Sequence, residues 1–114
     1  MAELYLRGDI VWVRNPINLT TCIQSGQRPY LIISNNKNNE NSTTLTAIPL
    51  TTKDKRYMPT HHHIFVNGNE NTILVEQITC ISKNNIVGYI DTIEDADLHK
   101  VEDKIKIQLG LKGV

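Results

Sequence analysis

The run of three histidines at residues 61–63 is the densest group of potential metal ligands in the chain. In a β-strand, His61 and His63 would lie on the same face, where both imidazoles can reach one ion. Structural zinc sites need four ligands, however, and catalytic sites need three. The other candidates are two cysteines and His99, and they are scattered along the chain. The sequence therefore predicts neither a bound metal nor a cofactor.

A basic segment at residues 53–56 contains Lys53, Lys55 and Arg56. Clustered lysine and arginine side chains attract phosphate groups, which makes this segment a candidate binding surface. A short run of charges is more often a solvated face, so the residue types alone leave both interpretations open.

A polar pair, Glu76 and Gln77, interrupts the otherwise apolar run at residues 72–81. Polar groups inside such a run usually need partners. The alternation of side chains along a strand explains one residue that points to solvent, but not two neighbours. The pair therefore marks either a ligand-binding face or a β-bulge.

The length of 114 residues allows one modest hydrophobic core, so we expect a single domain over residues 1–114. Apolar residues make up 39% of the chain and charged residues 21%, which excludes a disordered or collagen-like protein. The net charge is zero, which argues against a large electrostatic footprint on nucleic acid. Residues 1–90 carry eight basic and six acidic residues, whereas residues 91–103 hold six acids and one base. One face can therefore still present a basic groove.

No apolar run approaches the roughly 20 residues of a membrane span. Residues 1–7 also lack the apolar stretch of a secretory signal. We therefore expect a cytoplasmic protein without a membrane partner. In that compartment the two cysteines, Cys22 and Cys80, are expected to be free thiols.

Short runs rich in β-branched and aromatic residues predict strands. They cover residues 9–14, 29–34, 43–50, 61–66, 72–81 and 87–90. The run at 29–34 is nearly all apolar and suits a strand buried on both faces, while Pro49 predicts a sheet edge or a bulge. Asn67-Gly68 is a strong hairpin signal between two strands. We expect a long loop of a functional type at 15–27 and an asparagine-rich turn at 35–41.

A helix is predicted near the C-terminal end, beginning after Thr92 and with Asp95 as the partner in a capping box. Its apolar residues recur at spacings of three and four: Leu98, Val101, Ile105 and Leu109. Gly110 lies where a left-handed C-terminal cap belongs. Five or six short strands followed by one amphipathic helix indicate a mainly β, α+β protein. Its strands would form a small antiparallel barrel on which the helix packs.

Four segments in this order resemble the MazF/PemK toxins of type II toxin–antitoxin systems. They are residues 7–12 (RGDIVW), 26–35 (GQRPYLIISN), 59–61 (PTH) and 75–78 (VEQI). Residues 109–111 (LGL) add a match at the C-terminal end. Each segment alone is weak, but together they span nearly the whole chain and make the resemblance specific.

The resemblance implies an SH3-like barrel of the CcdB/MazF type and a homodimer. It also implies a sequence-specific, metal-independent endoribonuclease that cleaves single-stranded mRNA and so inhibits translation and growth. The RNA's own 2′-hydroxyl would attack, leaving a 2′,3′-cyclic phosphate and a 5′-hydroxyl. A cognate antitoxin with a partly disordered acidic segment would block the enzyme, and any contact with DNA would occur only through that antitoxin.

By the same resemblance the catalytic pair is Arg28 and Thr51. Arg28 follows the glycine of the long loop and precedes a proline, and Thr51 begins the loop after the third strand. The implied RNA-binding residues are Gln24, Asn35, Lys53, Lys55, Arg56, Met58, Pro59, Thr60, His61, Glu76 and Gln77. Residues 21–24 (TCIQ) depart from the family's Gly-Ser-Glu-Gln run and keep only the glutamine, so base preference and rate can differ here.

Arg28 suits the task of stabilising the extra negative charge on phosphorus. A guanidinium presents a fork of donors and stays protonated, which makes it a charge clamp and not a general base. Thr51 would donate a hydrogen bond to the phosphate or orient the 2′-hydroxyl. Without the resemblance, Arg28 would be interpreted as a surface salt bridge and Thr51 as an ordinary strand end.

Three other functions are open to such a barrel: a gyrase-directed poison of the CcdB kind, an SH3-like adaptor and a metal hydrolase. A gyrase binder would not need Arg28, Thr51 and the segment 59–61 together. An adaptor would need an aromatic-lined groove, and aromatic residues make up only 5% of the chain. A chelator test separates the metal hydrolase from the others.

Overall fold

The computed structural model describes residues 4–15 and 26–111. Its strands are β1 (Asp9–Asn15), β2 (Gly26–Ile32), β3 (Thr44–Thr51), β4 (His61–Val66), β5 (Asn69–Leu74), β6 (Thr79–Ser82) and β7 (Ile86–Thr92). Its helices are α1 (Asn36–Asn41) and α2 (Asp95–Gln108), with 3₁₀ turns η1 (Val75–Gln77) and η2 (Lys83–Asn85). Within these described ranges, no helix is long and apolar enough to cross a membrane.

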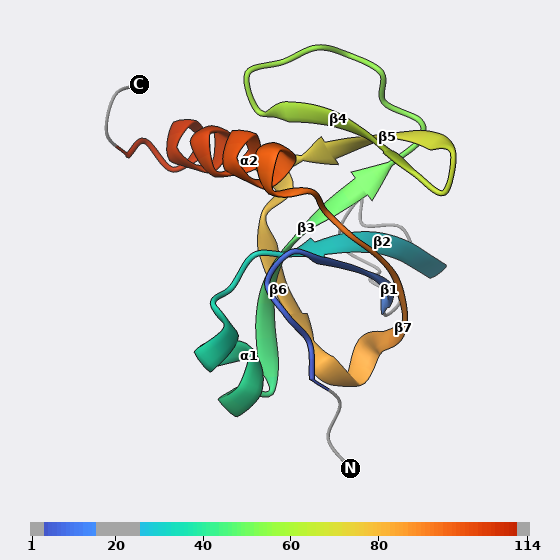
Figure 1. Cartoon of the computed structure of the whole chain (residues 1–114), viewed down its shortest axis with the longest axis vertical. Helices are drawn as coiled ribbons and strands as arrows, with labels where there is room; N and C mark the ends of the chain where they lie inside the picture. Colours follow the sequence, from blue (N-terminus) through green and yellow to red (C-terminus); the bar gives the residue numbers. More distant parts are fainter. Residues whose placement is uncertain (1–3, 16–25, 112–114) are drawn as a thin grey trace, which may run out of the picture.

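The strands form one antiparallel sheet in the order β4-β5-β3-β2-β1-β7, and β6 pairs with β3. β3 is the strand that bends this sheet, because it changes partners along its length. Residues 44–47 pair with β6, and residues 50–51 pair with β5. Pro49 lies between these two pairings on one side of β3 and stands across from Tyr30 of β2 on the other. The sheet edge or bulge predicted at Pro49 is therefore a change of partner within a central strand. Figure 1 shows β3 running from α1 at one end of the molecule to the β4–β5 hairpin at the other.

The central strands are buried on both faces of the sheet. One apolar cluster contains Leu31 and Ile48, and the other contains Ile32 and Ala47, all with an exposed fraction of 0%. Neighbours in sequence thus enter opposite clusters, as the pleat of a strand requires. This confirms the two-sided burial that the apolar run at 29–34 predicted, although β2 begins earlier, at Gly26.

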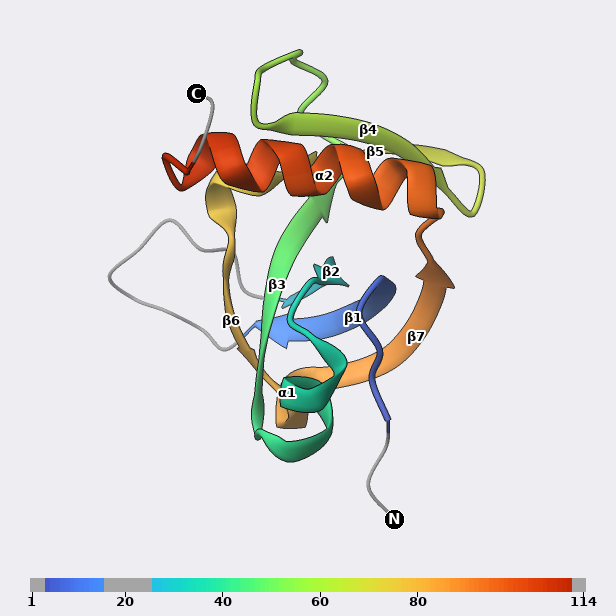
Figure 2. The ribbon, with the colours of Figure 1, turned by 60° about the vertical axis from the view of Figure 1, so that its left-hand side comes forward.

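The C-terminal helix packs on one face of the half-barrel, against β4 and η1 (Figure 2). Val101 is completely buried, with Leu98 and Ile105 packed against the same core. Gly110 has φ +67° and closes the helix, because Leu111 N–H donates to the Lys106 carbonyl at 2.8 Å. The helix and its glycine cap are therefore confirmed, and so is the mainly antiparallel β fold with one C-terminal helix.

Two details of the helix were predicted wrongly. Thr92 does not cap it: Thr92 ends β7, and Glu94 is the N-cap residue without a side-chain capping bond. The helix ends at Gln108, so Leu109 lies beyond it and is 53% exposed. A short capping motif is a weak signal when a neighbouring strand competes for the same residue.

Two segments between the strands also differ from the prediction. The asparagine-rich segment expected as a turn forms α1, capped by the Asn35 side chain, which accepts a bond from Asn38 N–H at 2.8 Å. The single strand expected at 72–81 is split into β5 and β6 by η1, which contains Glu76 and Gln77. The polar pair thus marks a break in the strand. The long loop predicted at 15–27 falls mostly on residues 16–25, outside the described residues.

The predicted hairpin is confirmed. Asn67 and Gly68 both have positive φ, +51° and +82°, as a type I′ turn demands, and Val66 pairs with Asn69 across it. The turn lies beside the beginning of β2, so its residues are near Arg28.

Candidate functional site

The register of the sheet brings Arg28 and Thr51 together. The β2–β3 ladder pairs Ile32 with Ala47 and ends at Tyr30 with Pro49. Arg28 precedes this ladder on β2 and Thr51 follows it on β3, so the two residues lie at the same end of the strand pair. Antiparallel pairing thus brings two residues that are distant in sequence to one end of the sheet.

This end of the sheet is hollowed into a cleft of about 310 Å³, which we call the Arg28 cleft. Its lining comes from six strands, β1, β2, β3, β4, β5 and β7, and from the residues that follow β3 and β4. The lining residues are Trp12, Gln27, Arg28, Pro29, Leu50, Thr51, Thr52, Lys53, Val66, Asn67, Asn69, Asn71 and Ile90. Leu50 and Val66 belong to the apolar core, so the cleft is an open end of the half-barrel's interior with a polar rim.

Thr51 is held with its hydroxyl group ready to donate. Its Oγ1 accepts the Lys53 backbone N–H at 3.1 Å, which fixes the oxygen at the end of β3. A hydroxyl that accepts one bond still carries its own proton. Arg28 is half-buried in the strand facing it. The rim therefore combines a fixed cation with a neutral donor, the two groups that suit a phosphate oxygen.

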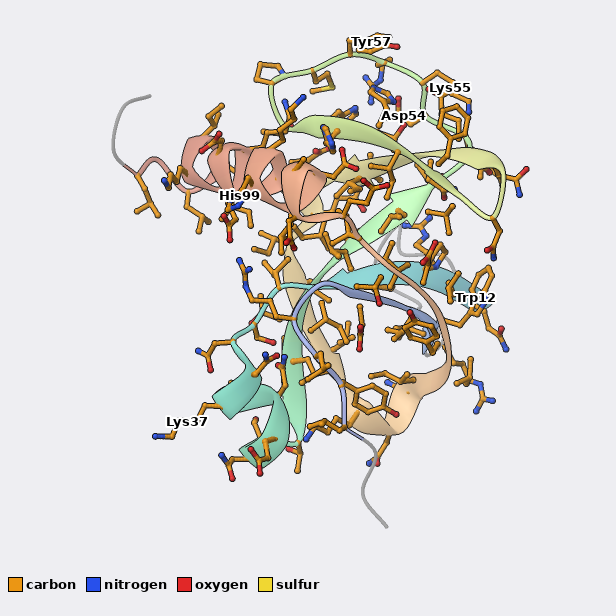
Figure 3. The ribbon with its side chains drawn as sticks, in the orientation of Figure 1. Trp12, Lys37, Asp54, Lys55, Tyr57 and His99 are labelled. Carbon is orange, nitrogen blue, oxygen red and sulfur yellow. The ribbon has the colours of Figure 1, made fainter. Side chains whose placement is uncertain are left out.

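Sequence reasoning missed two features of this cleft. Trp12 was used only as part of a motif, yet its side chain lines the cleft and is 40% exposed (Figure 3). Asn67, Asn69 and Asn71 were interpreted only through the hairpin turn. The sequence did offer a signal for Trp12: it stands in a β-branched run between Val11 and Val13, which are both buried. A large aromatic on the opposite face of such a strand indicates a contact surface.

The three basic residues of the segment 53–56 have different surroundings. Lys53 lines the Arg28 cleft. Lys55 Nζ lies 3.5 Å from the Glu70 carboxylate, and Arg56 makes a two-bond pair with Asp54 at 2.8 and 3.0 Å. The hydrogen bonds from Arg56 hold the pKa of Asp54 far below its usual range. Two of the three cations are thus paired with carboxylates, and only Lys53 stands in the cleft.

The segment 60–61 and Glu76 form a separate, closed network. The side chain of His61 is 0% exposed; its Nε2 lies 2.9 Å from Glu76 Oε2, and its Nδ1 lies 3.0 Å from the Arg56 carbonyl. Thr60 Oγ1 donates to the other oxygen of Glu76 at 3.0 Å. Burial alone would raise the pKa of Glu76, but these hydrogen bonds outweigh it and the pKa is lowered. The network fastens β4 to η1.

The other two histidines are also hydrogen-bonded to neighbouring elements. His62 Nε2 lies 2.9 Å from Asp97 of α2. His63 Nδ1 lies 3.1 Å from Thr72 Oγ1 on β5, and its ring lies 4.4 Å from that of Tyr57. We call His61, His62, His63 and their partners the histidine cluster. Each histidine ties β4 to a different element, which explains the run in structural terms.

The remaining predicted RNA-binding residues are spread over the surface. Met58, Pro59 and Gln77 are exposed near the histidine cluster, and the Pro59 carbonyl accepts Lys104 Nζ at 3.3 Å. Asn35 caps α1 at the far end of β2. Gln24 and Cys22 lie outside the described residues, while Cys80 is an exposed free thiol. The structure thus brings together Arg28, Thr51 and Lys53, and separates them from the other described members of the set.

A second opening of about 490 Å³ lies between the histidine cluster and α2, with Tyr57, Lys100 and Lys104 in its walls. It is larger than the Arg28 cleft but holds neither Arg28 nor Thr51. Each of its histidines bonds a neighbouring element through one ring nitrogen, although His63 Nε2 is buried with no hydrogen-bond partner among the described residues, and Lys104 is bonded to the Pro59 carbonyl. The Arg28 cleft is therefore the candidate active site.

Comparison with known proteins identifies the family. The family model described as PemK-like, MazF-like toxin of type II toxin–antitoxin system matches residues 6–109. The endoribonuclease MazF of Staphylococcus saprophyticus is 32% identical over 96 residues, covering 80% of this chain and 80% of the relative. The crystal structure of MazF from Deinococcus radiodurans matches with a TM-score of 0.83 at 20% identity, covering 96% of this chain and 100% of the other. An endoribonuclease from a mycobacterial species, solved with its cognate antitoxin, matches with a TM-score of 0.80 at 24% identity over 96% and 99%.

The fold defines the class first: an antiparallel half-barrel with a C-terminal helix, the MazF fold. The chain belongs to the PemK-like, MazF-like toxins of type II toxin–antitoxin systems, a family of endoribonucleases. The resemblance drawn from the sequence segments is thereby confirmed.

Proposed function

We propose that this toxin is a sequence-specific, metal-independent endoribonuclease that cleaves single-stranded mRNA in the cytoplasm and so stops translation and growth. The 2′-oxygen of the RNA forms a bond to the adjacent phosphorus while the bond from phosphorus to the 5′-oxygen breaks. The 2′-hydroxyl loses its proton and the departing 5′-oxygen gains one. The products are a 2′,3′-cyclic phosphate and a 5′-hydroxyl end.

Arg28 and Thr51 are the proposed catalytic residues. The Arg28 guanidinium donates to the non-bridging phosphate oxygens, whose negative charge grows as the fifth bond to phosphorus forms. The Thr51 hydroxyl, held by the Lys53 N–H, donates to the same phosphate or orients the 2′-hydroxyl. Lys53 adds attraction for the backbone. The observation that supports this best is the convergence of Arg28 and Thr51, 23 positions apart in sequence, on one cleft.

The other predicted RNA contacts are proposed as a path beyond the cleft. Met58, Pro59 and Gln77 are exposed and can contact the RNA where it leaves the cleft. Thr60, His61 and Glu76 position this segment through their network and do not face the Arg28 cleft. Lys55, Arg56, Gln24 and Asn35 remain proposed contacts for more distant nucleotides.

The decisive experiment is incubation with a long RNA of defined sequence, followed by mapping of the fragment ends. We expect cuts at a few short sequences in unpaired regions, with 5′-hydroxyl and 2′,3′-cyclic phosphate ends. Excess chelator should leave the rate unchanged, because no step uses a metal. Intact RNA would overturn the proposal, and so would full inhibition by chelator that zinc or magnesium reverses.

We further propose that residues 1–114 act as one domain, that the protein is a homodimer, and that a cognate antitoxin blocks the cleft through a partly disordered acidic segment. Contact with DNA would come only through that antitoxin. The similar mycobacterial endoribonuclease has been solved with its own antitoxin, which supports such a partner here. Light scattering should give a dimer mass at micromolar concentration. The antitoxin should compete with RNA; tight binding that leaves cleavage untouched would mean that it covers another surface.

A further inference from the structure

Asn71 is a buried amide whose hydrogen-bonding capacity is only partly used. The residue is 5% exposed, yet its side chain lines the Arg28 cleft. Its Nδ2 donates to the Asn69 carbonyl at 3.1 Å, and the described residues supply no donor to its Oδ1. Buried side-chain amides normally have partners for both ends. In contrast, the buried Asn39 bonds Ser34 through both its oxygen and its nitrogen.

The strand fixes the direction of this amide. Side chains alternate along β5, so Asn71 shares a face with Asn69 and Ile73, and Ile73 is a fully buried core residue. That face is the interior of the half-barrel, where it opens into the Arg28 cleft. The free acceptor and the second N–H of Asn71 are therefore available to a molecule inside the cleft.

The rest of the cleft suits a flat ring. Leu50, Val66 and Ile90 give it apolar walls, and Trp12 contributes an aromatic surface. Opposite Trp12 on β7 stands Gly88, and a Cβ built there would meet no atom within 4 Å. The absence of a side chain at this position leaves space beside the indole. A volume of about 310 Å³ is at the small end of ligand pockets.

We infer that the Arg28 cleft holds one nucleobase, stacked on Trp12, and that Asn71 is the residue that determines which base is accepted. This inference rests on the proposed function. An amide offers an acceptor and a donor side by side, and the polar edge of a base offers the complementary pair. Stacking on an aromatic side chain tolerates every base, so discrimination falls to Asn71. Because Arg28 and Thr51 stand at the rim, the base that Asn71 reads belongs to a nucleotide next to the cleaved bond.

Cleavage of a pool of RNAs with randomised sequence, followed by sequencing of the 5′-hydroxyl ends, tests this inference. The wild-type protein should favour one base at a position beside the cut. In Asn71→Ala the rate at the favoured base should fall about tenfold or more, which is the typical effect of losing a two-bond contact to a base. The rate at the other bases should change less than about threefold. The preference is thus lost while cleavage continues.

Asn39→Ala is the matched control, since it also removes a buried asparagine. It should lower the melting temperature but keep the wild-type base preference. If the wild type does not cut RNA, the proposed function fails. If the wild type cuts RNA and Asn71→Ala keeps the same preference, the proposed function stands and the inference about Asn71 is wrong.

A second measurement on the wild type keeps the test decisive if Asn71→Ala does not fold. Trp12 is the chain's one tryptophan, so its fluorescence reports the cleft directly. Titration with hexamers of deoxyuridine, deoxycytidine or deoxyadenosine, which lack the attacking 2′-hydroxyl, should quench this fluorescence. One hexamer should bind about tenfold more tightly than the others. Equal binding of all three, or binding without quenching, would overturn the inference.

Discussion

The Arg28 cleft and the histidine cluster each include residues of the β4–β5 hairpin, but their polar side chains differ in how far their hydrogen bonds are made within the protein. In the histidine cluster His61 is buried between Glu76 and a backbone carbonyl, and His62 is bonded to Asp97. In the Arg28 cleft the Thr51 hydroxyl keeps its proton to donate, and Asn71 Oδ1 accepts no hydrogen bond from the part of the chain that the structure describes.

This contrast separates structural polarity from functional polarity. A buried polar group whose bonds are all made within the fold contributes stability and has little left for a ligand. A polar group fixed by one bond and open on its other side is preorganised for a ligand. Residue type does not distinguish the two cases, since both regions contain groups that can bind phosphate or bases. Substitutions in the cleft should therefore change activity, and substitutions in the cluster should change stability.

The largest expected effect comes from Arg28→Ala. Loss of a preorganised donor to developing negative charge typically costs about 100-fold to 1,000-fold in rate. The melting temperature should barely move, because the change in the free energy of unfolding for such a surface substitution is within about 0.5 kcal/mol. Arg28→Lys should restore part of the RNA affinity but little of the turnover, since a point charge lacks the guanidinium fork. Fluorogenic RNA cleavage and thermal melts measure both quantities.

Arg14→Ala is the control for Arg28→Ala. Arg14 is an exposed arginine of β1 outside the cleft lining, so both variants remove the same charge. An equal loss of rate in both variants would show that general attraction to RNA, and not a position in the cleft, explains the effect. A near wild-type rate in a folded Arg28→Ala protein would remove Arg28 from the mechanism.

Thr51→Ala should have a smaller effect, about 10-fold to 100-fold in rate, because a neutral hydroxyl donor contributes less than an ionised one. Thr51→Ser keeps the hydroxyl and should retain most activity. Thr52→Ala, which alters the next residue in the same cleft, should stay within about threefold of the wild type. Single-turnover cleavage with saturating enzyme measures the rates. Equal losses in Thr51→Ala and Thr51→Ser would contradict a role for the hydroxyl.

His61→Ala tests the other half of the comparison. It removes a fully buried side chain with two polar contacts, so we expect a loss of about 2–4 kcal/mol in the free energy of unfolding. The melting temperature should fall by about 10 °C. The cleavage rate with excess RNA, measured well below that temperature, should stay within about threefold. His99→Ala, at a histidine whose side chain is 77% exposed, should leave the melting temperature nearly unchanged.

A large loss of rate in a folded His61→Ala protein would place the histidine cluster in the catalytic machinery. It would also remove the distinction between the two regions. Normal stability of the same variant would instead mean that the buried network contributes little to the fold.

The smallest effect concerns acid stability. The hydrogen bonds from His61 and Thr60 outweigh burial and lower the pKa of Glu76 below its ordinary value of 4.5. A carboxyl group with a lowered folded-state pKa stabilises the fold above its unfolded pKa, and this contribution is lost as the pH falls through the folded pKa. The difference in unfolding free energy between wild type and Glu76→Gln should therefore be constant above about pH 5 and shrink below about pH 4.5.

Urea unfolding of both proteins across this pH range measures that difference. The difference isolates Glu76 from Asp54 and Glu102, whose pKa values are also lowered by neighbouring arginines. A difference that does not change with pH would show that Glu76 gains nothing from its charged form in the folded state.

Patterns local in sequence predicted much of the fold. The turn at Asn67-Gly68, β1, the bounds of β4 and the apolar stripe of α2 follow from backbone preference and side-chain periodicity, which act over a few residues. Predictions failed where distant pairing competed with local signals. Thr92 pairs with Asp9 of β1 and therefore belongs to β7. The run at 72–81 is interrupted by η1, and the two strands on either side of it, β5 and β6, pair with different parts of β3.

The same division applies to the site. The sequence by itself determined the family, and with it Arg28 and Thr51 as candidates. Short motifs in a fixed order can be recognised without knowing which residues are in contact. The tertiary structure decided which residues share the cleft. The pairing of β2 with β3 puts Arg28 and Thr51 at the same end of the two strands, and the type I′ turn brings the asparagines of the hairpin to the same opening. It also buried His61 with Glu76, because the pairing of β4 with β5 sets His61 across from Leu74 and so places the beginning of β4 beside η1.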